Sequence, residues 1–356
     1  MKSITVLFPL AGETPVGGFK VACEYANRLC QDNFEVHIAY QTSLAFKEPN
    51  FRRKARRLIK FLYYRFIKGY SCSIWFPLDK RIKEHFLYSL DYRRVPKTDY
   101  YIATAVETAF FLRTYDIPNR NKLYLIQDLE NWNVPEAVAI KTYNYGFQNI
   151  VVSHWLADIV KAAGANCTLI PNGFDFENFT LVEPICKRNK LNVAMMYSTQ
   201  ERKGCEYGLA ALASVKEKHP ELKVTLFGVH PKPKELPLYI QYYQMPDKET
   251  HNKIYNKAAI FLAPSTNEGW GLPVGEAMIC GCAVVCTDNR GFREMAENEV
   301  TALMSPVRDA QSLAKNIIRL INDDSLRISI AKRGTENIRQ FNWEDSFEKL
   351  KTLLRD

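Results

Sequence analysis

Short apolar runs alternate with amphipathic segments throughout the first half of the chain. The run at 4–10 precedes Gly17-Gly18, after which apolar residues at 19, 22, 26 and 29 keep the three-to-four spacing of a helix. We predict strands at 4–10, 34–40, 100–104, 123–127, 150–152 and 168–170. Because helices separate these strands, the pattern favours a parallel sheet with helices on both faces.

The second half of the chain repeats this alternation. Apolar runs predict strands at 192–196, 223–227, 259–263 and 283–287, and helical spacing dominates from 312 onward. Between the halves, Pro171-Asn172-Gly173 suits a turn, and 171–190 shows no clear periodicity. The sequence therefore predicts an α/β protein of two doubly wound domains, 1–180 and 181–342, with a ligand cleft at the carboxyl ends of the strands.

Composition narrows the class of protein. Hydrophobic residues make up 47% of the 356 residues and charged residues 24%, which excludes a disordered or fibrous chain. The nine cysteines are irregularly spaced, so we expect no disulfide framework and a reduced, cytoplasmic setting. Cys280, Cys282 and Cys286 lack the spacing of a zinc site. No apolar run approaches the ~20 residues that a membrane-spanning helix needs.

Positive charge is concentrated in one segment. The formal charge of the chain is +9, and residues 52–68 contain eight basic side chains and no acidic one. Apolar residues at 51, 55, 58, 59, 62 and 66 form a helical stripe, with basic residues largely on the other side. Two interpretations stay open: a basic amphipathic helix at 51–68 that binds an anionic membrane surface, or a helix packed on the core with a solvated basic side. We expect no nucleic-acid partner.

A glycine pair lies between the first predicted strand and the first predicted helix. The surrounding loop lacks the Lys and Ser or Thr of a P-loop, and it lacks the Gly-x-Gly-x-x-Gly of dinucleotide-binding folds. Backbone N–H groups at a helix N-terminus suit an anion, which makes Gly17 and Gly18 candidates for phosphate binding. An ordinary tight turn explains the pair equally well.

The most specific pattern follows the predicted strand at 259–263. It reads Ser265-Thr-Asn-Glu268-Gly-Trp-Gly-Leu-Pro-Val-Gly-Glu276. Its glycines interrupt the periodicity and Pro273 suits the first turn of a helix, so we expect Glu268 on a loop and Glu276 in that helix's opening turn. The amides of 269–271 can face a pyrophosphate, and both carboxylates can accept hydrogen bonds from sugar hydroxyls. A carboxylate that stabilises a helix dipole accounts for Glu276 alone, but not for the whole pattern.

These residues resemble the signature of the retaining nucleotide-sugar glycosyltransferases of family 4 (glycosyltransferases group 1), which have the GT-B fold. That signature is a Glu, seven residues and a second Glu within Glu-Gly-aromatic-Gly-Leu-Pro, which Glu268 and Glu276 match. Further matches extend over almost the whole chain: Gly17-Gly18, 170–175, Arg202-Lys203-Gly204, 291–294 and 341–343. The resemblance implies two Rossmann-like domains that face each other across a cleft. The acceptor-side domain would be 1–180 and the nucleotide-sugar-binding domain 181–342, with a C-terminal helix at 343–356 packing back on the first.

The family's roles transfer to the matching positions. Glu268 would contact the transferred sugar, Glu276 the ribose hydroxyls, and Lys203 with Arg202 the diphosphate. The implied donor-binding residues are Gly17, Gly18, Arg202, Lys203, Met245, Glu268, Gly269, Trp270, Gly271, Leu272 and Glu276. The implied catalytic residues are Glu268, Lys203, Arg202 and Asp128. The partners would be a nucleoside-diphosphate sugar donor and a saccharide or lipid-linked saccharide acceptor.

The chain departs from the family pattern at two places. Tyr197 and Ser198 stand where many members have a further Arg, and Gln127 stands where many have a His that faces the transferred sugar. A Gln cannot relay protons, so Gln127 can act only through hydrogen bonds. Gln127-Asp128 followed by Glu130 resembles a subgroup of rhamnosyltransferases, which points toward a deoxythymidine-diphosphate sugar.

The resemblance also implies retention of anomeric configuration, with the departing phosphate taking the acceptor's proton. We expect no resident cofactor and no metal, because the sequence lacks the Asp-x-Asp pattern of GT-A glycosyltransferases. Three other functions stay open: a nucleotide-sugar epimerase, a phosphorylase-like enzyme that binds pyridoxal, and a non-catalytic nucleotide-sugar-binding subunit. We expect a cytoplasmic protein, peripheral on the inner face of the cell membrane, that acts in cell-surface glycan biosynthesis.

Overall fold

Two parallel β-sheets contain most of the predicted apolar runs. The computed structural model describes residues 1–10, 14–42, 51–131 and 134–355. The chain divides into a first unit, Met1–Asn172 with Glu344–Asp356, and a second unit, Gly173–Trp343. The division falls inside the Pro-Asn-Gly turn, before the boundary expected at 180.

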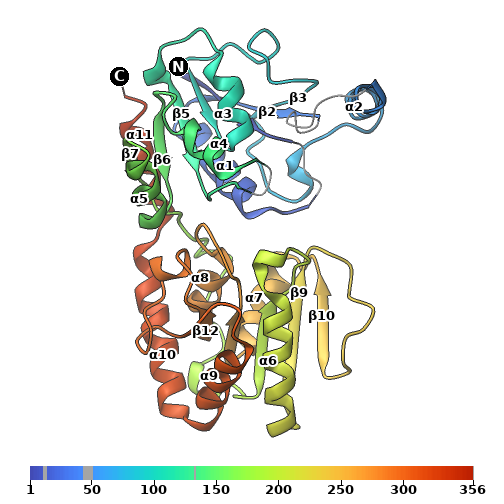
Figure 1. The fold of residues 1–356 in the computed structure, drawn as a ribbon, viewed down its shortest axis with the longest axis vertical. Coiled ribbons are helices and arrows are strands. Elements are labelled where there is room, and N and C mark those ends of the chain that lie inside the picture. Colours follow the sequence, from blue (N-terminus) through green and yellow to red (C-terminus); the bar gives the residue numbers. More distant parts are fainter. Residues whose placement is uncertain (11–13, 43–50, 132–133, 356) are drawn as a thin grey trace. The chain divides into compact units, whose positions relative to one another are not determined.

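The sheet of the first unit is parallel throughout, in the order β3-β2-β1-β4-β5-β6-β7 (Figure 1). Its strands are β1 (Ser3–Phe8), β2 (Glu35–Gln41), β3 (Lys83–Leu87), β4 (Tyr100–Ala103), β5 (Lys122–Ile126), β6 (Gln148–Val151) and β7 (Cys167–Leu169). The helices of this unit are α1 (Gly17–Gln31), α2 (Phe51–Tyr63), α3 (Val106–Arg113), α4 (Glu136–Thr142) and α5 (His154–Ala162), together with α11 (Trp343–Thr352).

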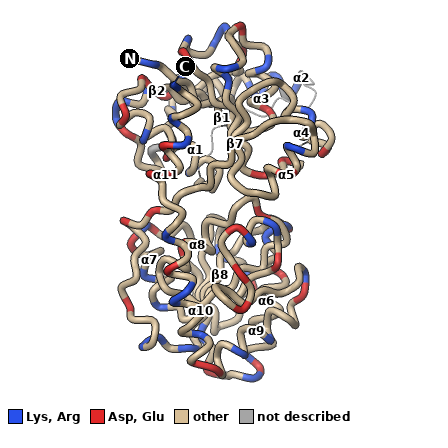
Figure 2. The backbone as a smooth tube through the Cα atoms, turned by 90° about the vertical axis from the view of Figure 1, so that its left-hand side faces the viewer, with Lys and Arg blue, Asp and Glu red and all other residues tan. Residues whose placement is uncertain are grey.

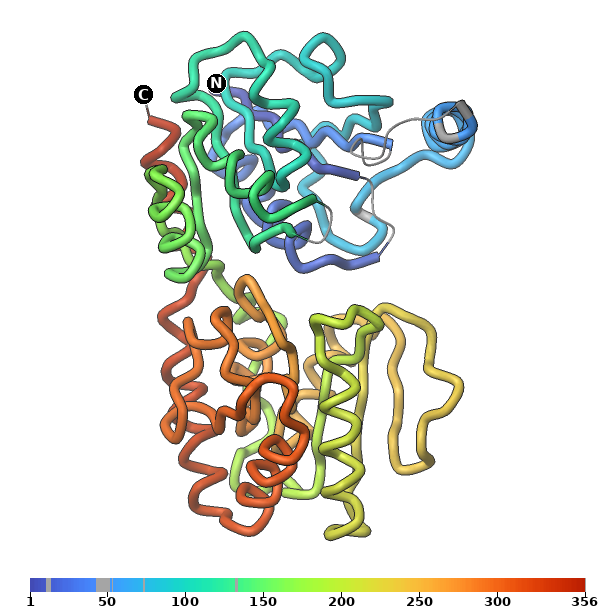
Figure 3. Tube along the Cα trace, in the orientation of Figure 1, coloured from blue at the N-terminus to red at the C-terminus, as the bar shows by residue number. Residues whose placement is uncertain are grey.

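Helix α11 returns the end of the chain to the first unit. The Leu354 carbonyl accepts hydrogen bonds from Tyr100 Oη at 3.1 Å and from Lys2 Nζ at 2.6 Å. Ser346 Oγ donates to the Pro171 carbonyl at 2.6 Å. In Figure 3 the red C-terminal segment accordingly lies in the same unit as the blue N-terminus.

The sheet of the second unit is also parallel, in the order β10-β9-β8-β11-β12-β13. Its strands are β8 (Asn192–Met196), β9 (Lys223–Gly228), β10 (Ile240–Gln244), β11 (Ile260–Ala263), β12 (Ala283–Thr287) and β13 (Ala302–Ser305). Its helices are α6 (Cys205–Lys218), α7 (Lys248–Lys257), α8 (Leu272–Ile279), α9 (Ala310–Asn322) and α10 (Asp324–Asn337). In both units the strand order reverses beside the first strand, so the predicted α/β class with two doubly wound sheets is confirmed.

The apolar runs of the central strands form the hydrophobic core of the second unit. Leu262 of β11 and Val285 of β12 are fully buried, because helices cover both faces of the sheet. Cys280, Cys282 and Cys286 are likewise buried. All nine cysteines of the chain lie in the described ranges, and each is a free thiol. Within those ranges, no helix is both long and apolar enough to cross a membrane.

Candidate functional site

Two loops meet at the point where the order of the second sheet reverses. β8 and β11 are neighbours in this sheet, and their chains continue in opposite directions across it. After β8 comes a 3₁₀ turn at Glu201–Lys203, and after β11 comes the loop that leads to α8. Ligands of doubly wound folds bind outside the carboxyl ends of the strands at such a reversal. The topology therefore places Lys203 and Glu268 at the expected ligand site of this unit.

Backbone contacts fasten the two loops together. Thr266 donates its backbone N–H to the Arg202 carbonyl at 2.8 Å. Gly204 begins α6 with a φ of 56°, and a Cβ at this position would lie 2.2 Å from the Pro264 carbonyl oxygen. A side chain here would therefore force the loops apart, which explains the glycine of the Arg-Lys-Gly motif.

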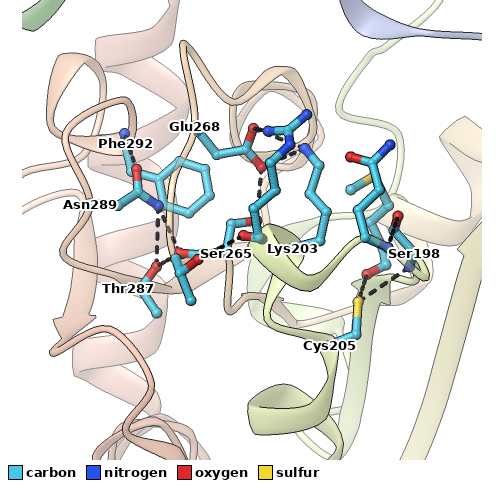
Figure 4. A network of polar contacts seen from close by, with 12 residues as sticks. Ser198, Lys203, Cys205, Ser265, Glu268, Thr287, Asn289 and Phe292 are labelled. Carbon is cyan, nitrogen blue, oxygen red and sulfur yellow. Dashed lines mark hydrogen bonds and ion pairs between the residues drawn. The ribbon is translucent and has the colours of Figure 1, made fainter. Parts of the chain in front are cut away.

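Glu268 is the centre of a buried ion-pair network (Figure 4). Lys203 Nζ lies 2.6 Å from its Oε1 and 2.8 Å from its Oε2, and Arg202 Nη1 lies 3.5 Å from Oε2. The side chain of Glu268 is only 8% exposed and that of Lys203 15%. Charged hydrogen bonds in such a site are stronger than at the surface because water screens them less.

The network keeps Glu268 ionised. Burial alone would raise the pKa of this carboxyl, but the charges of Lys203 and Arg202 and hydrogen bonds from Lys203 and Ser265 bring it below its usual value. The site thus combines one fixed negative charge with two cations at the carboxyl edge of the sheet. Such an arrangement can bind a sugar through the carboxylate and a phosphate through the cations.

A second layer of side chains holds the Glu268 loop in place. Ser265 Oγ donates to Glu268 Oε1 at 2.8 Å, and the Ser265 carbonyl accepts hydrogen bonds from Thr287 Oγ1 and from Asn289 Nδ2. Asn289 Oδ1 in turn accepts the backbone N–H of Phe292 at 3.0 Å (Figure 4). Thr287 and Asn289 belong to no motif in the sequence, because Thr and Asn are common and their contacts exist only in the folded sheet. Ser265 and Phe292 lie inside the 265–276 and 291–294 motifs, which assigned them no role.

Gly291 is needed for this loop arrangement. A Cβ on Gly291 would lie 2.3 Å from the Glu268 carbonyl oxygen and 3.0 Å from its Cβ. Any larger residue would therefore push the Glu268 loop away from the cations. This close approach gives a physical reason for the 291–294 motif.

Glu276 lies further along α8 than expected. The helix begins at Leu272 after Gly271, whose φ is 105°, with Pro273 in the first turn as predicted. The first turn contains no acidic residue, so the prediction that Glu276 lies in the opening turn is wrong. Glu276 is 5% exposed, and its Oε2 accepts a hydrogen bond from Tyr255 Oη at 3.2 Å.

The remaining predicted residues of this unit lie around these loops. Gly269, Trp270 and Gly271 form the segment between Glu268 and α8, and Leu272 is the first residue of the helix. The Trp270 ring packs edge-on against Phe341 at a centroid distance of 5.1 Å. Met245 follows β10 with a φ of 44°, and β9 separates its strand from β8.

Gly17, Gly18 and Asp128 belong to the first unit. Gly17 begins α1, and Gln127 Nε2 donates to the Gly18 carbonyl at 2.9 Å. This bond joins the carboxyl end of β5 to the start of α1, and a role of Gln127 toward the transferred sugar stays a prediction. Asp128 Oδ1 accepts the backbone N–H of Leu129 at 2.9 Å.

A partly buried carboxyl group follows Asp128 at Glu130. Glu130 Oε2 accepts the backbone N–H of Val106 at 3.0 Å, at the start of α3. Desolvation, together with the charges of Asp128 and Glu107, raises the pKa of Glu130 to about 8 despite the lowering effect of the Val106 bond. Glu130 therefore titrates close to neutral pH.

Helix α2 contacts the first unit through Arg57 and Phe61. Arg57 Nη2 donates to the Tyr88 carbonyl at 2.5 Å, and its guanidinium lies 4.5 Å from the centre of the Tyr88 ring. Phe61 stacks on Phe86 of β3 with ring centres 6.1 Å apart. Figure 1 shows α2 at the periphery of the unit, beyond β3.

The outer side of α2 carries both apolar and basic residues. Ile59 is 66% exposed, and Phe66, in the π-helical turn Tyr64–Lys68 that follows, is 74% exposed. Arg52, Arg56 and Lys60 are exposed as well. The described part of the apolar stripe therefore does not pack on the core, which removes that interpretation. In the second unit, by contrast, basic and acidic residues are interspersed along the helices (Figure 2).

No group of three or more His, Cys, Asp or Glu residues within the described ranges is arranged to hold a metal ion. The cations that the site supplies are those of Lys203 and Arg202.

Comparison with protein families identifies the second unit. Residues 183–337 match the family model described as Glycosyl transferases group 1. This segment includes Lys203, Glu268 and Glu276, so the residues that form the site lie inside the matched region. The second unit therefore belongs to the glycosyl transferases group 1 family.

Two relatives illustrate the sequence similarity. Phosphatidyl-myo-inositol mannosyltransferase of Mycolicibacterium smegmatis is 25% identical over 194 residues, which cover 52% of this chain and 50% of that protein. O-antigen chain mannosyltransferase B of Escherichia coli is 33% identical over 107 residues, which cover 30% of this chain and 28% of that protein. The chain thus spans about half the length, or less, of these curated relatives.

Solved structures are similar in fold to both units of the chain. Sucrose-phosphate synthase from Thermosynechococcus elongatus has a TM-score of 0.73 at 17% identity and covers 100% of this chain and 98% of its own. Anabaena Alr3699/HepE, in complex with UDP-glucose, has a TM-score of 0.73 at 16% identity and covers 99% of each chain. At these identities the likeness establishes the fold, and the whole chain has the GT-B fold of glycosyltransferases.

Proposed function

We propose that the chain is a glycosyltransferase that moves a sugar from a nucleoside-diphosphate sugar to a saccharide or lipid-linked saccharide acceptor in cell-surface glycan biosynthesis. The observation that carries this proposal is the buried Glu268 carboxylate, held by Lys203 and Arg202 where the strand order reverses. The family match and the mannosyltransferase relatives support the reaction class.

Each group of the site has a distinct part in the proposed reaction. Glu268 orients the sugar, and Glu276 binds the ribose hydroxyls of the nucleoside. Lys203 and Arg202, with the backbone amides of 269–271, stabilise the charge that grows on the departing diphosphate. Since these groups supply the positive charge, the proposed reaction needs no metal ion.

We propose that transfer retains the anomeric configuration and that the departing phosphate accepts the proton of the acceptor hydroxyl. No protein nucleophile is then required, and Glu268 can stay in its ion pair with Lys203. For Gly17 and Gly18 of the first unit, the proposed role is binding of the donor phosphate, and for Asp128 it is a catalytic one. Proton NMR of the first-formed product tests this: the donor's anomeric configuration is expected, and the inverted one would contradict it.

The reaction itself is tested with a panel of UDP-, GDP- and dTDP-sugars, by measuring release of the nucleoside diphosphate with saccharide and lipid-linked acceptors present. We expect one donor class to be consumed, and Glu268→Gln to abolish its consumption. Binding of a nucleotide sugar without turnover under all conditions would instead indicate a non-catalytic binding subunit. A product that keeps the nucleotide would indicate an epimerase.

We further propose that α2 docks the protein on an anionic membrane surface. Its exposed apolar residues can enter the interface while the neighbouring cations meet lipid phosphates. In vesicle sedimentation, changing Arg52, Arg56 and Arg65 to Glu should abolish binding to anionic liposomes. A matched control changes Arg93, Arg120 and Lys161, which are exposed outside α2, and should sediment like the wild type. Equal sedimentation of the α2 variant and the wild type would refute docking.

A further inference from the structure

Glu276 is held by a buried tyrosine on another helix. Tyr255 lies near the end of α7 and is fully buried, and its Oη donates to Glu276 Oε2 at 3.2 Å. Burial, and next the charge of Glu276, raises the pKa of this phenol well above its usual value. The hydroxyl therefore stays protonated at neutral pH and always faces the carboxylate as a donor.

The direction of this hydroxyl is fixed by its aromatic neighbours. The Tyr255 ring stacks on His251 at a centroid distance of 4.8 Å and meets Phe261 edge-on at 5.4 Å. Phe227 and Phe179 complete the cluster at 5.5 and 5.8 Å. Because rings on different elements enclose Tyr255, the ring position is fixed and places the hydroxyl oxygen within hydrogen-bond distance of Glu276.

We propose that Tyr255 is a positioning residue, which holds the Glu276 carboxylate in the orientation that receives the ribose hydroxyls of the donor. The inference rests on the proposed function, since it assigns a partner to the proposed ribose-binding carboxylate. The bond from Tyr255 occupies one of about four lone-pair positions of the carboxylate and restricts its orientation. The contact with the nucleotide is made by Glu276, and Tyr255 acts through it.

The test uses Tyr255→Phe, which removes one hydroxyl and keeps the ring packing. The probes are UDP and GDP, each compared with its 2′-deoxy counterpart by isothermal titration. In the wild type the ribonucleotide should bind more tightly. In Tyr255→Phe we expect this preference to shrink on the order of 3- to 10-fold, which is less than the loss of a direct charge-assisted hydrogen bond because Tyr255 acts through Glu276. Turnover at saturating donor should stay the same, because ribose contacts are equal in the ground and transition states.

A matched control variant separates an effect on the orientation of Glu276 from an effect on the stability of the protein. Tyr115 of the first unit is also buried, and its Oη donates to the Leu90 carbonyl at 2.6 Å. Tyr115→Phe therefore removes a buried hydrogen-bonded hydroxyl away from Glu276, and should lower the melting temperature while the ribose preference stays at the wild-type value. In the Glu276→Gln background, Tyr255→Phe should have little further effect on that preference.

The possible outcomes distinguish the two proposals. If Glu276→Gln loses the ribose preference while Tyr255→Phe keeps it in full, the positioning role is wrong and the proposed function stands. If no nucleoside diphosphate binds to the wild type, the proposed function is overturned, and the role of Tyr255 with it.

Discussion

Removing the Lys203 charge tests the ion-pair network that organises the site. Lys203→Met keeps the length of the side chain and leaves the Glu268 carboxylate, which is 8% exposed, with Arg202 as its remaining cation at 3.5 Å. Losing one partner of a buried ion pair costs about 3–5 kcal/mol, because the other charge stays buried without compensation. Arg202 offsets part of this loss, so we expect the free energy of unfolding to fall by about 2–3 kcal/mol.

The double variant gives the sharper measurement. In Lys203→Met with Glu268→Gln, neither charge remains, so the double variant should be more stable than the sum of the single changes predicts. We expect a coupling energy of about 1.5–3 kcal/mol from urea titrations at pH 7. The pKa of Glu268 is lowered in the folded state, so the stabilisation is present above its ordinary pKa of 4.5 and disappears as the pH falls through the folded value. Additive single effects at pH 7 would refute the ion pair.

Three further predictions concern single residues. Ser265→Ala removes a hydrogen bond to Glu268 and should lower turnover on the order of 3- to 10-fold, with donor affinity nearly unchanged, as steady-state kinetics would show. Gly291→Ala should displace the Glu268 loop and lower both stability and turnover, whereas unaltered kinetics would argue against the close contact. Glu130, with a folded pKa of about 8, stays protonated when folded but ionises when unfolded above its usual pKa. The melting temperature should therefore fall between about pH 4.5 and 8, and Glu130→Gln should remove most of this slope.

The strands that the sequence missed all lie at sheet edges, although one edge strand, β7, was predicted within one residue of its bounds. Central strands such as β8 (Asn192–Met196) and β12 (Ala283–Thr287) were predicted with their observed bounds, because burial on both faces requires continuous apolar runs. β3, β10 and β13 were missed, and all three are edge strands. In β3, Lys-Glu-His-Phe-Leu mixes charged and apolar residues, since an edge strand has fewer neighbours to bury it.

Only the site residues that belong to a recognisable sequence motif could be predicted from the sequence. Lys203 and Glu268 were identified by motifs, and the structure brings them into contact across two loops. Tyr255 and Ser265 lie on either side of β11 and contact the two motif carboxylates. Tyr255 belongs to no motif, and Ser265 lies inside the 265–276 motif but had no role assigned to it. Their roles depend on the packing of α7 and β11 against α8, which only the fold determines.

The sequence was also insufficient to predict what the exposed side of α2 contacts. Periodicity identified the helix and its apolar stripe, but the same stripe suits a core or a membrane surface equally. The structure shows that Arg57 and Phe61 hold the helix to its unit, whereas Ile59 and Phe66 are exposed. An aromatic and cationic contact surface next to β3 is a feature that hydropathy alone does not predict.

Nucleoside diphosphate affinity in Glu268→Gln and Glu276→Gln tests the central assignment most directly. A nucleoside diphosphate has a ribose but no transferred sugar, so Glu276→Gln should weaken its binding on the order of 10- to 100-fold. Glu268→Gln should bind it at least as tightly as the wild type, because Lys203 no longer shares its charge with Glu268. Weakened binding in Glu268→Gln together with unchanged binding in Glu276→Gln would show that the roles of the two carboxylates are reversed.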